Sequence, residues 1–450
     1  MAAEHGTNDG GQQARAHRGD VPPPRGPFGF VDQETGFRGW QAVLAGDREL
    51  ATPCVGDGRV FLGGGFGSFE FYALDATTGE PAWARRTSDD GPTAATLSGT
   101  RVLFNTESCT LCCHEARGGD LLWERWLGDP LLAQPAVGAG RVFMAYPQGG
   151  HHWLTALRLE DGVSLWEAEL PGDVISAPVF AEGKVWVSLW DGTVASFDPG
   201  EGKQLWSRKM RATSAPWVSG GEVFVSVREG DTEDAPREST HRLSREQRHR
   251  AQKLREALYY ERKRGTHHDR HWRASDAGVG FAEAPAAAKL DQFERLTGWT
   301  GVHSAWRHQG SRPCVWNGLL FGVAGDVLSA TRAQASHAED ELWTWEAPRG
   351  VNGERGMTPP AVTNGRVYAG CGDGRVRSWD ARTGALRWSV DVHSRVAWPP
   401  VVWKGWVYVG LDAGRIVAFS TGDPQDHGWG MWGGGPGHNG SAARVAEPAV

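Results

Sequence analysis

The chain has 450 residues, of which 40% are hydrophobic and 22% charged, and its formal net charge is −7. This balance allows a packed core and gives no overall attraction to nucleic acid or to an anionic membrane. No stretch approaches the roughly 18 uninterrupted apolar residues of a membrane-spanning helix. The 62 glycines and 25 prolines indicate many turns, so we expect an all-β protein.

Residues 1–27 are rich in Gly, Pro and polar side chains and lack the apolar region of a secretory signal peptide. We expect a disordered tail, because such a composition cannot bury enough apolar surface to overcome chain entropy. The absence of a signal predicts a cytoplasmic location for the chain as encoded. Residues 28–450 are expected to form a single domain.

A unit of about forty residues recurs through this domain. Each copy opens on a proline and a β-branched run, turns at a pair such as Glu182-Gly183, and turns again at a pair such as Asp191-Gly192. Successive hairpins give four short strands per unit. Units of this length are typical of β-propeller blades. The opening prolines are Pro53, Pro92, Pro135, Pro178, Pro216, Pro313, Pro360 and Pro400.

These openers predict an eight-bladed propeller of four-stranded antiparallel blades. The last unit lacks the Asp-Gly-Trp ending of the others, whereas the N-terminal segment carries an unmatched copy at Asp32, Gly36 and Trp40. We therefore expect residues 29–44 to form the outer strand of the last blade. Closing the ring in this way removes free sheet edges.

Most units end on an acidic residue, a glycine four residues later and a tryptophan four residues after that, as in Asp75-Gly79-Trp83. Glycine permits the positive φ of a tight turn, and a tryptophan on the outer strand can lie flat against the next blade with its N–H bonded. We therefore expect a structural, blade-docking role for six tryptophans: Trp40, Trp83, Trp123, Trp166, Trp206 and Trp388.

These endings carry a family resemblance. ALDATTGEPAW (Ala73 to Trp83), SFDPGEGKQLW (Ser196 to Trp206) and SWDARTGALRW (Ser378 to Trp388) resemble the tryptophan-docking motif of PQQ-like, or quinoprotein alcohol dehydrogenase-like, β-propellers. The segment WGMWGGGPGHNG (Trp429 to Gly440) is similar to a Trp-Gly-His-Gly signature of the same family. The resemblance implies the fold; it does not select an activity, because members with and without a cofactor share the motif.

The fifth unit is interrupted, since Pro216 and Pro313 lie 97 residues apart. We place an insertion at about residues 229–298, and insertions in repeat proteins map to loops on one face, often the binding face. Residues 240–264 are rich in helix formers and have a narrow apolar stripe. The sequence therefore predicts a partly helical insertion in the fifth blade.

The insertion is also basic, with eleven Lys or Arg against four acids between Arg242 and Arg273. One interpretation is a solvated helix whose charges keep it soluble. The other is a docking element for an acidic protein, nucleic acid or lipid head groups. The candidate partner-binding residues are Arg245, Arg248, Arg250, Lys253, Arg255, Arg262, Lys263 and Arg264.

A run of cysteines, Cys109, Cys112 and Cys113, precedes His114. Such spacing can be redox-active or bind zinc, and adjacent cysteines resemble the ring-forming disulfide beside PQQ in some alcohol dehydrogenases. Alignment with other units places the run in a strand, so Cys112 and Cys113 should face opposite sides and His114 should replace a packed Phe. We favour a packing role for the cysteines.

The pair His151-His152 and the patch His267 to His271 are interpreted as solvated loops.

Two functions stay open. The resemblance implies, as one alternative, a dehydrogenase that oxidises an alcohol or sugar with PQQ and Ca²⁺; it would need oxygen ligands for the metal, a carboxylate base and an Arg at the quinone. We cannot match residues of this chain to those roles one by one. We therefore favour a monomeric, non-catalytic propeller that acts as a protein-binding or assembly scaffold, with no cofactor or metal. A periplasmic location is the family-based alternative.

Overall fold

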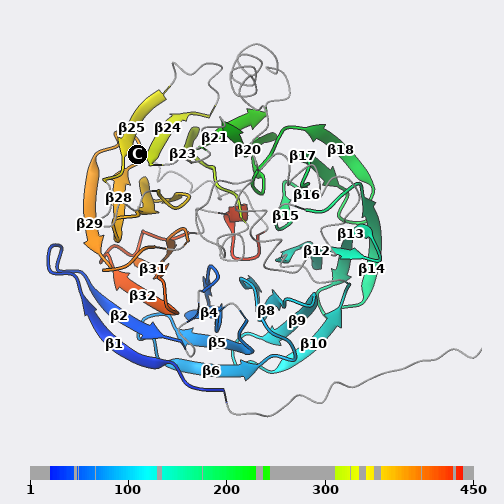
Figure 1. Cartoon of the computed structure of the whole chain (residues 1–450), viewed down its shortest axis with the longest axis horizontal. Helices are drawn as coiled ribbons and strands as arrows, with labels where there is room; N and C mark the ends of the chain where they lie inside the picture. The colour runs from blue at the N-terminus through cyan, green and yellow to red at the C-terminus, as the bar shows by residue number, and fades with distance from the viewer. Residues whose placement is uncertain are drawn as a thin grey trace, which may run out of the picture.

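Antiparallel sheets follow one another around a central axis in the computed structural model (Figure 1). The structure describes residues 21–44, 48, 50–65, 67–128, 134–174, 176–229, 237–243, 310–324, 326–333, 341–348, 356–396, 398–428 and 432–438. Within these ranges the strands form eight sheets, of which seven have four or five strands and one has three. The chain is therefore an all-β propeller with seven complete blades.

The first four blades each use four consecutive strands, running from the axis to the rim (Figure 1). Each first strand is short, because it lies at the narrow centre of the ring. The strands are β3 (Cys54–Gly56), β4 (Arg59–Gly63), β5 (Glu70–Asp75), β6 (Pro81–Arg86), β7 (Thr96–Ser98), β8 (Arg101–Asn105), β9 (Thr110–Glu115), β10 (Leu121–Trp126), β11 (Ala136–Gly138), β12 (Arg141–Gln148), β13 (His151–Arg158), β14 (Ser164–Leu170), β15 (Val179–Ala181), β16 (Lys184–Ser188), β17 (Thr193–Phe197) and β18 (Gln204–Lys209).

The rest of the ring contains a three-stranded sheet, two more four-stranded blades and the closing blade. A 3-10 turn, η3 (Trp432–Gly434), follows the last strand. The strands are β19 (Trp217–Ser219), β20 (Glu222–Glu229), β21 (Arg237–Leu243), β22 (Cys314–Trp316), β23 (Leu319–Ala324), β24 (Val327–Arg332), β25 (Glu341–Glu346), β26 (Ala361–Thr363), β27 (Arg366–Gly370), β28 (Arg375–Asp380), β29 (Leu386–Asp391), β30 (Val401–Trp403), β31 (Trp406–Gly410) and β32 (Arg415–Ser420).

Turn chemistry explains the hairpins near the axis. Glu182 and Gly183 have φ values of 49° and 70°, and Asn364 and Gly365 have 50° and 67°. Two successive positive φ values define the type I′ turn, whose twist matches that of the strands it joins. The turn predicted at Glu182-Gly183 is confirmed, and Asn364-Gly365 forms a turn of the same kind.

The closing blade differs from the prediction. Two N-terminal strands, β1 (Arg25–Val31) and β2 (Arg38–Val43), join it in the order β1-β2-β32-β31-β30. Strand β2 takes the fourth place by pairing with β32, and β1 adds a fifth strand outside it. The expectation of eight four-stranded blades closed by a single strand is therefore wrong. A hairpin satisfies the outer edge of β2, which a lone closing strand would leave unpaired.

The predicted helix also needs correction. Its first residues, from Thr240, lie in β21, which pairs with β20 in the three-stranded sheet. A short helix with a narrow apolar stripe is marginal alone, whereas the open edge of β20 offers backbone partners at once. The described part of the chain has no α-helix, and no helix there is long and apolar enough to cross a membrane. The remainder of the predicted insertion lies outside the described residues.

The core lies between adjacent blades. For example, the buried rings of Phe71 on β5 and Phe104 on β8 stack with their centroids 3.9 Å apart. Burying an aromatic side chain of this kind stabilises a fold by about 1.5–3 kcal/mol. Repetition of such contacts joins the blades into one ring.

Candidate functional site

Tryptophans on the outer strands bond to the next blade. The indole N–H of Trp83, on β6, donates to the carbonyl oxygen of Ala116 at 3.0 Å, and Trp123 makes the same bond to Leu159 at 3.1 Å. A buried indole N–H needs a partner, and these carbonyls supply it. Equivalent bonds join Trp40 to Ala76 at 3.2 Å, Trp166 to Pro199 at 2.9 Å and Trp343 to Ala381 at 3.1 Å.

A glycine lies beneath each of these five rings. Gly79 has a φ of 76°, and a Cβ placed on it would lie 2.6 Å from the ring of Trp40. Gly119 lies below Trp83 in the same way, with a φ of 76° and a 2.6 Å approach. A side chain would therefore meet both backbone strain and the indole ring. The other pairs are Gly162 with Trp123, Gly202 with Trp166 and Gly384 with Trp343.

Two of the six predicted tryptophans have a different environment. Trp388 packs edge-on against Phe37, 5.6 Å between ring centroids, and Trp206 packs edge-on against Trp186 at 5.8 Å. Sequence reasoning also missed Trp343. Its unit lacks the Asp-Gly spacing, but Leu342-Trp343 repeats the Leu-Trp pair of Leu165-Trp166, a signal that could have found it.

The cysteine run is part of the core. Cys112 packs in one apolar cluster with Phe71, whereas Cys113 packs in another with Val137. The prediction that they face opposite sides of β9 is confirmed. Burial raises the pKa of Cys113 to about 12 and raises that of Cys112 further. Both thiols are therefore protonated near neutral pH, and only thiolates are strong nucleophiles and metal ligands.

His114 occupies the place of a packed aromatic side chain, as predicted. It is buried, and its ring stacks on Phe104 with centroids 5.4 Å apart. Its Nδ1 donates to the carbonyl of Gly119 at 3.0 Å. Desolvation by burial is the main cause that lowers the pKa of His114. The imidazole therefore packs as a neutral ring.

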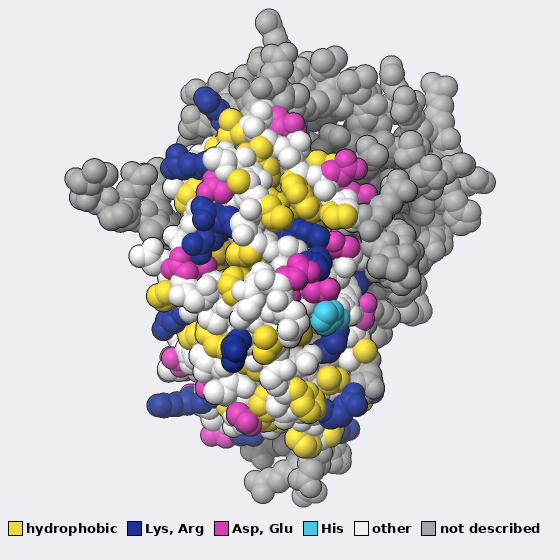
Figure 2. Space-filling view, turned by 90° about the vertical axis from the view of Figure 1, so that its left-hand side faces the viewer, with side chains coloured by type: hydrophobic (Ala, Val, Ile, Leu, Met, Phe, Trp, Pro, Cys, Tyr) yellow, Lys and Arg dark blue, Asp and Glu magenta, His cyan; other side chains and the backbone are white. Residues whose placement is uncertain are grey.

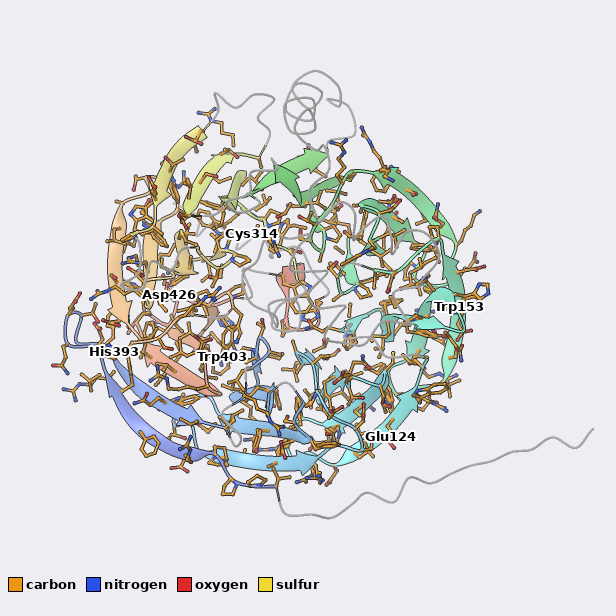
Figure 3. The ribbon with its side chains drawn as sticks, in the orientation of Figure 1. Glu124, Trp153, Cys314, His393, Trp403 and Asp426 are labelled. Carbon is orange, nitrogen blue, oxygen red and sulfur yellow. The ribbon has the colours of Figure 1, made fainter. Side chains whose placement is uncertain are left out.

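His151 and His152 begin strand β13, so their interpretation as a solvated loop is wrong; both lie next to acidic residues. His151 Nδ1 is 2.8 Å from Glu169 Oε1 at an exposed position, and His152 Nδ1 is 3.8 Å from Asp173 Oδ1 in a more buried one. Figure 3 places Trp153, the next residue, at the rim of the ring. The eight basic candidates from Arg245 to Arg264, and the patch His267 to His271, lie outside the described residues.

The C-terminal segment 432–438, red at the centre of Figure 1, lies on the propeller axis. The innermost strands have edges that face this axis, so their amide N–H groups need acceptors. Carbonyls of the segment accept these bonds from three blades in succession. The bonds are Leu97 N–H to Pro436 at 2.8 Å, Val137 N–H to Gly437 at 2.8 Å and Phe180 N–H to His438 at 3.0 Å.

Side chains anchor the same segment. Trp432 is buried and stacks on His438, with 3.6 Å between ring centroids. Trp432 also packs on Gly310, where an added Cβ would lie 2.2 Å from its ring. His438 Nδ1 donates to the carbonyl of Pro135 at 2.9 Å. The axial space beside β7, β11 and β15 is therefore filled by the chain itself.

Two polar side chains are buried next to inner strands. Gln134 and Arg312 are buried just before β11 and β22, and burial lowers the pKa of the Arg312 guanidinium. In the described ranges no three His, Cys, Asp or Glu side chains come together as metal ligands would. Calcium needs several oxygen ligands, carboxylates above all.

Large apolar side chains are exposed on the outer strands. On β10, Leu121, Leu122 and Trp126 are all exposed, and Trp126 is 62% exposed. Glu124, between them, lies at the rim in Figure 3. On the side of the ring that Figure 2 presents, apolar side chains are instead interspersed with charged ones. We call Leu121, Leu122 and Trp126 the β10 patch.

Comparison with known protein families assigns this propeller to one of them. The PQQ_2 family, described as "Outer membrane protein assembly factor BamB", matches residues 28–125, 108–232 and 325–427, which together make up more than half of the chain. The chain belongs to this family of PQQ-like repeat propellers. The predicted resemblance to the PQQ-like repeat family is thereby confirmed.

Individual PQQ-like relatives are distant. The assembly factor BamB of Yersinia pestis is 23% identical over 222 residues, which cover 43% of this chain and 55% of the relative. That of Moranella endobia (strain PCIT) is 27% identical over 180 residues, covering 36% of this chain and 44% of the relative. The chain thus spans about half the length of the curated relatives it matches.

Solved structures share the fold. BamB from Moraxella catarrhalis superposes with a TM-score of 0.53 at 15% identity, covering 84% of this chain and 96% of that one. The quinohemoprotein alcohol dehydrogenase from Comamonas testosteroni superposes with a TM-score of 0.53 at 14% identity, covering 86% and 76%. Because one is an assembly factor and the other an enzyme, these likenesses establish the fold alone.

Proposed function

We propose that this PQQ-like propeller is a non-catalytic, protein-binding scaffold of the assembly-factor type. The observation that carries the proposal is the β10 patch, where two leucines and a tryptophan are exposed on one outer strand. Exposed apolar side chains that gather in one place mark protein contact sites, and Trp is enriched among the residues that dominate binding. The names of the curated relatives agree with this assignment.

The tryptophans that bond across blades have a separate, structural role in this proposal. Their indole N–H groups and their ring faces are both engaged by the next blade, so they are not available to stack on a ligand. We assign the docking role to the five tryptophans with this geometry. A rigid ring then presents the outer strands in a constant arrangement.

The proposal includes neither PQQ nor Ca²⁺. Its support is the C-terminal segment, whose carbonyls and two stacked rings take up the space beside three inner strands. A planar cofactor on the axis would compete with these contacts. The buried, protonated pair Cys112 and Cys113 also faces two different apolar clusters, which disfavours a disulfide between them.

Photo-crosslinking in cells that produce the protein tests this function. The photoreactive amino acid p-benzoylphenylalanine replaces Trp126, and in a control it replaces Lys203, an exposed residue of another blade. We expect a discrete protein adduct from position 126, none from position 203, and loss of the adduct when Leu122→Glu is added. Two results would overturn the proposal: no adduct at position 126, or stoichiometric PQQ and Ca²⁺ binding with dye-linked oxidation of an alcohol.

A further inference from the structure

A groove of about 490 Å³ lies where the closing blade meets the β3–β6 blade. Strand β1 lines it with Phe28 and Gly29, the β5–β6 turn lines it with Thr77 and Thr78, and Trp406 contributes from β31. The groove is shallow and widely open to solvent. We call it the ring-closure groove.

The fifth strand makes this junction unlike the others. In the described part of the ring only the closing blade has a strand outside its fourth one, and that strand, β1, forms a wall of the groove. Phe28 on β1 is 53% exposed. Because Phe28 pairs with Gln41 whereas Gly29 pairs with Trp40, the Phe28 side chain lies on the opposite face of β1 from Gly29, which shares the groove side with Trp40.

Trp406 departs from the repeat at the same place. It is the first residue of the second strand of its unit, and Figure 3 labels Trp403, its partner in the β30–β31 hairpin. The half-buried Trp406 adds an aromatic surface to the groove at a position where other units have a half-buried cation. Five other units have a cation there: Arg59, Arg101, Arg141, Lys184 and Arg366.

Arg38 supplies a positive charge to this aromatic hollow. It is exposed, begins β2 and lines the groove. In three other outer strands the first residue is uncharged: Pro81, Leu121 and Gln204. Among the residues that the structure describes, Arg38 has no carboxylate partner. A guanidinium presented beside aromatic rings is suited to a carboxylate on a bound molecule.

We infer that the ring-closure groove binds an extended segment of a partner protein in which an aromatic or aliphatic side chain is followed by Asp or Glu. The apolar side chain lies against Trp406, and the acidic side chain pairs with Arg38, which lies on the same face of the sheet as Trp406 through the shared pairing of β2 and β31 with β32. This inference rests on the proposed protein-binding function and names the chemistry of one contact. The groove is distinct from the β10 patch, which belongs to another blade.

A photoreactive peptide tests the groove on the purified full-length chain. The probe is acetyl-Gly-benzoylphenylalanine-Glu-Gly-amide, with adducts mapped by mass spectrometry. We expect adducts at residues 27–29, 38–40 or 406, and a yield at least tenfold lower when Gln replaces Glu in the peptide, because a hydrogen bond to a charged group contributes about 1.5–3 kcal/mol. Equal yields from the two peptides would overturn the role of Arg38.

Gly29 provides a variant that fills the groove without disturbing the fold. It lies in a strand, its φ is not positive, and a Cβ on it meets nothing within 4 Å. We expect Gly29→Val and Arg38→Gln each to lower the adduct yield at least tenfold. The controls Gly172→Val, at an equally open glycine, and Arg117→Gln, at another exposed arginine, should leave the yield unchanged.

The outcomes separate this inference from the proposed function. If Gly29→Val leaves the peptide adducts unchanged, the groove is not the binding site, even if crosslinking from position 126 persists in cells. If only a peptide with a free terminal carboxylate, acetyl-Gly-benzoylphenylalanine, reacts at the groove, the internal acidic segment is wrong. Loss of the position 126 adduct alone overturns the proposed function and leaves the peptide result standing.

Discussion

The indole N–H of Trp40 donates to the carbonyl oxygen of Ala76, 3.2 Å away, across the junction between the closing blade and the β3–β6 blade. The hydroxyl of Tyr408, on β31, donates to the same oxygen at 2.9 Å. One carbonyl of the first blade thus receives donors from an N-terminal strand and from a strand more than 300 residues later. The stability of the ring therefore depends on this junction.

Replacing Trp40 by Ala should open this junction. We expect the free energy of unfolding to fall by about 3–5 kcal/mol, because the change removes a buried aromatic side chain and leaves a cavity. Trp40→Phe, which mainly removes the hydrogen bond, should cost about 1 kcal/mol. Trp126→Ala, at an exposed position, should change it by about 0.5 kcal/mol or less. Urea denaturation followed by circular dichroism measures all three, and equal losses at Trp40 and Trp126 would contradict the closure role.

Glycine is favoured at Gly99 by its backbone conformation alone, and at Gly79 by both its backbone conformation and the closeness of a neighbouring ring. Both have a positive φ, 76° and 56°, but only Gly79 has an indole ring where a Cβ would lie. Gly99→Ala should cost about 1 kcal/mol through backbone strain alone. Gly79→Ala should cost about 3 kcal/mol or more, because strain is added to a clash with Trp40. The difference between their denaturation midpoints checks the contact, and similar midpoints would argue against it.

His114 should make stability depend on pH. Desolvation lowers its pKa in the folded state, so on acidification the unfolded chain takes up a proton before the folded chain does. The contribution is fully present above the unfolded pKa of about 6.5 and is lost as pH falls from there through the folded pKa. His114→Phe removes this dependence. Thermal unfolding of both proteins between pH 5 and 8 measures it; parallel curves would show that His114 titrates normally.

Asp426 should contribute more to the free energy of unfolding than an exposed acidic residue does. It is fully buried, pairs with Arg366 and accepts a hydrogen bond from Asn364 Nδ2 at 3.0 Å. Asp426→Asn should cost about 1.5–3 kcal/mol, because it weakens hydrogen bonds to a charged group while Arg366 keeps its pair with Asp423 at 2.9 Å. The control is Asp161→Asn, whose pair with Arg158 is exposed at 2.8 Å and should contribute less than about 1 kcal/mol. Comparable losses in the two variants would mean that solvent screens both pairs.

Local chemistry accounts for what could be predicted within each blade. Positive φ at Gly183 and Gly365 is required by two-residue turns, and Cys112 and Cys113 alternate because strand geometry alternates. These features depend on residues close in the chain. The tryptophan endings could be recognised for the same reason, although Trp343 was missed because its unit lacks the Asp-Gly part of the pattern.

Strand pairing between residues far apart in the chain accounts for the features that could not be predicted from the sequence. Strand β21 replaced the start of a predicted helix because the edge of β20 was open to it, and β1 joined β2 because that edge was open too. The ring-closure groove exists only because β1 meets residues of both ends of the ring. Nothing in the sequence of residues 25–43 indicates that Trp406 will lie next to them in the folded chain.

The repeat endings were therefore sufficient to predict a PQQ-like propeller. Each blade is a local unit, and its turn residues and tryptophan lie within one repeat of about forty residues. The unmatched ending at Trp40 also predicted that the N-terminal segment completes the last blade, as the pairing of β2 with β32 shows. Only the tertiary structure decided that this segment closes the ring as a hairpin, and that segment 432–438 lies on the axis. Both depend on backbone edges that stay unpaired until the whole ring is assembled, and such edges leave no signal in the sequence.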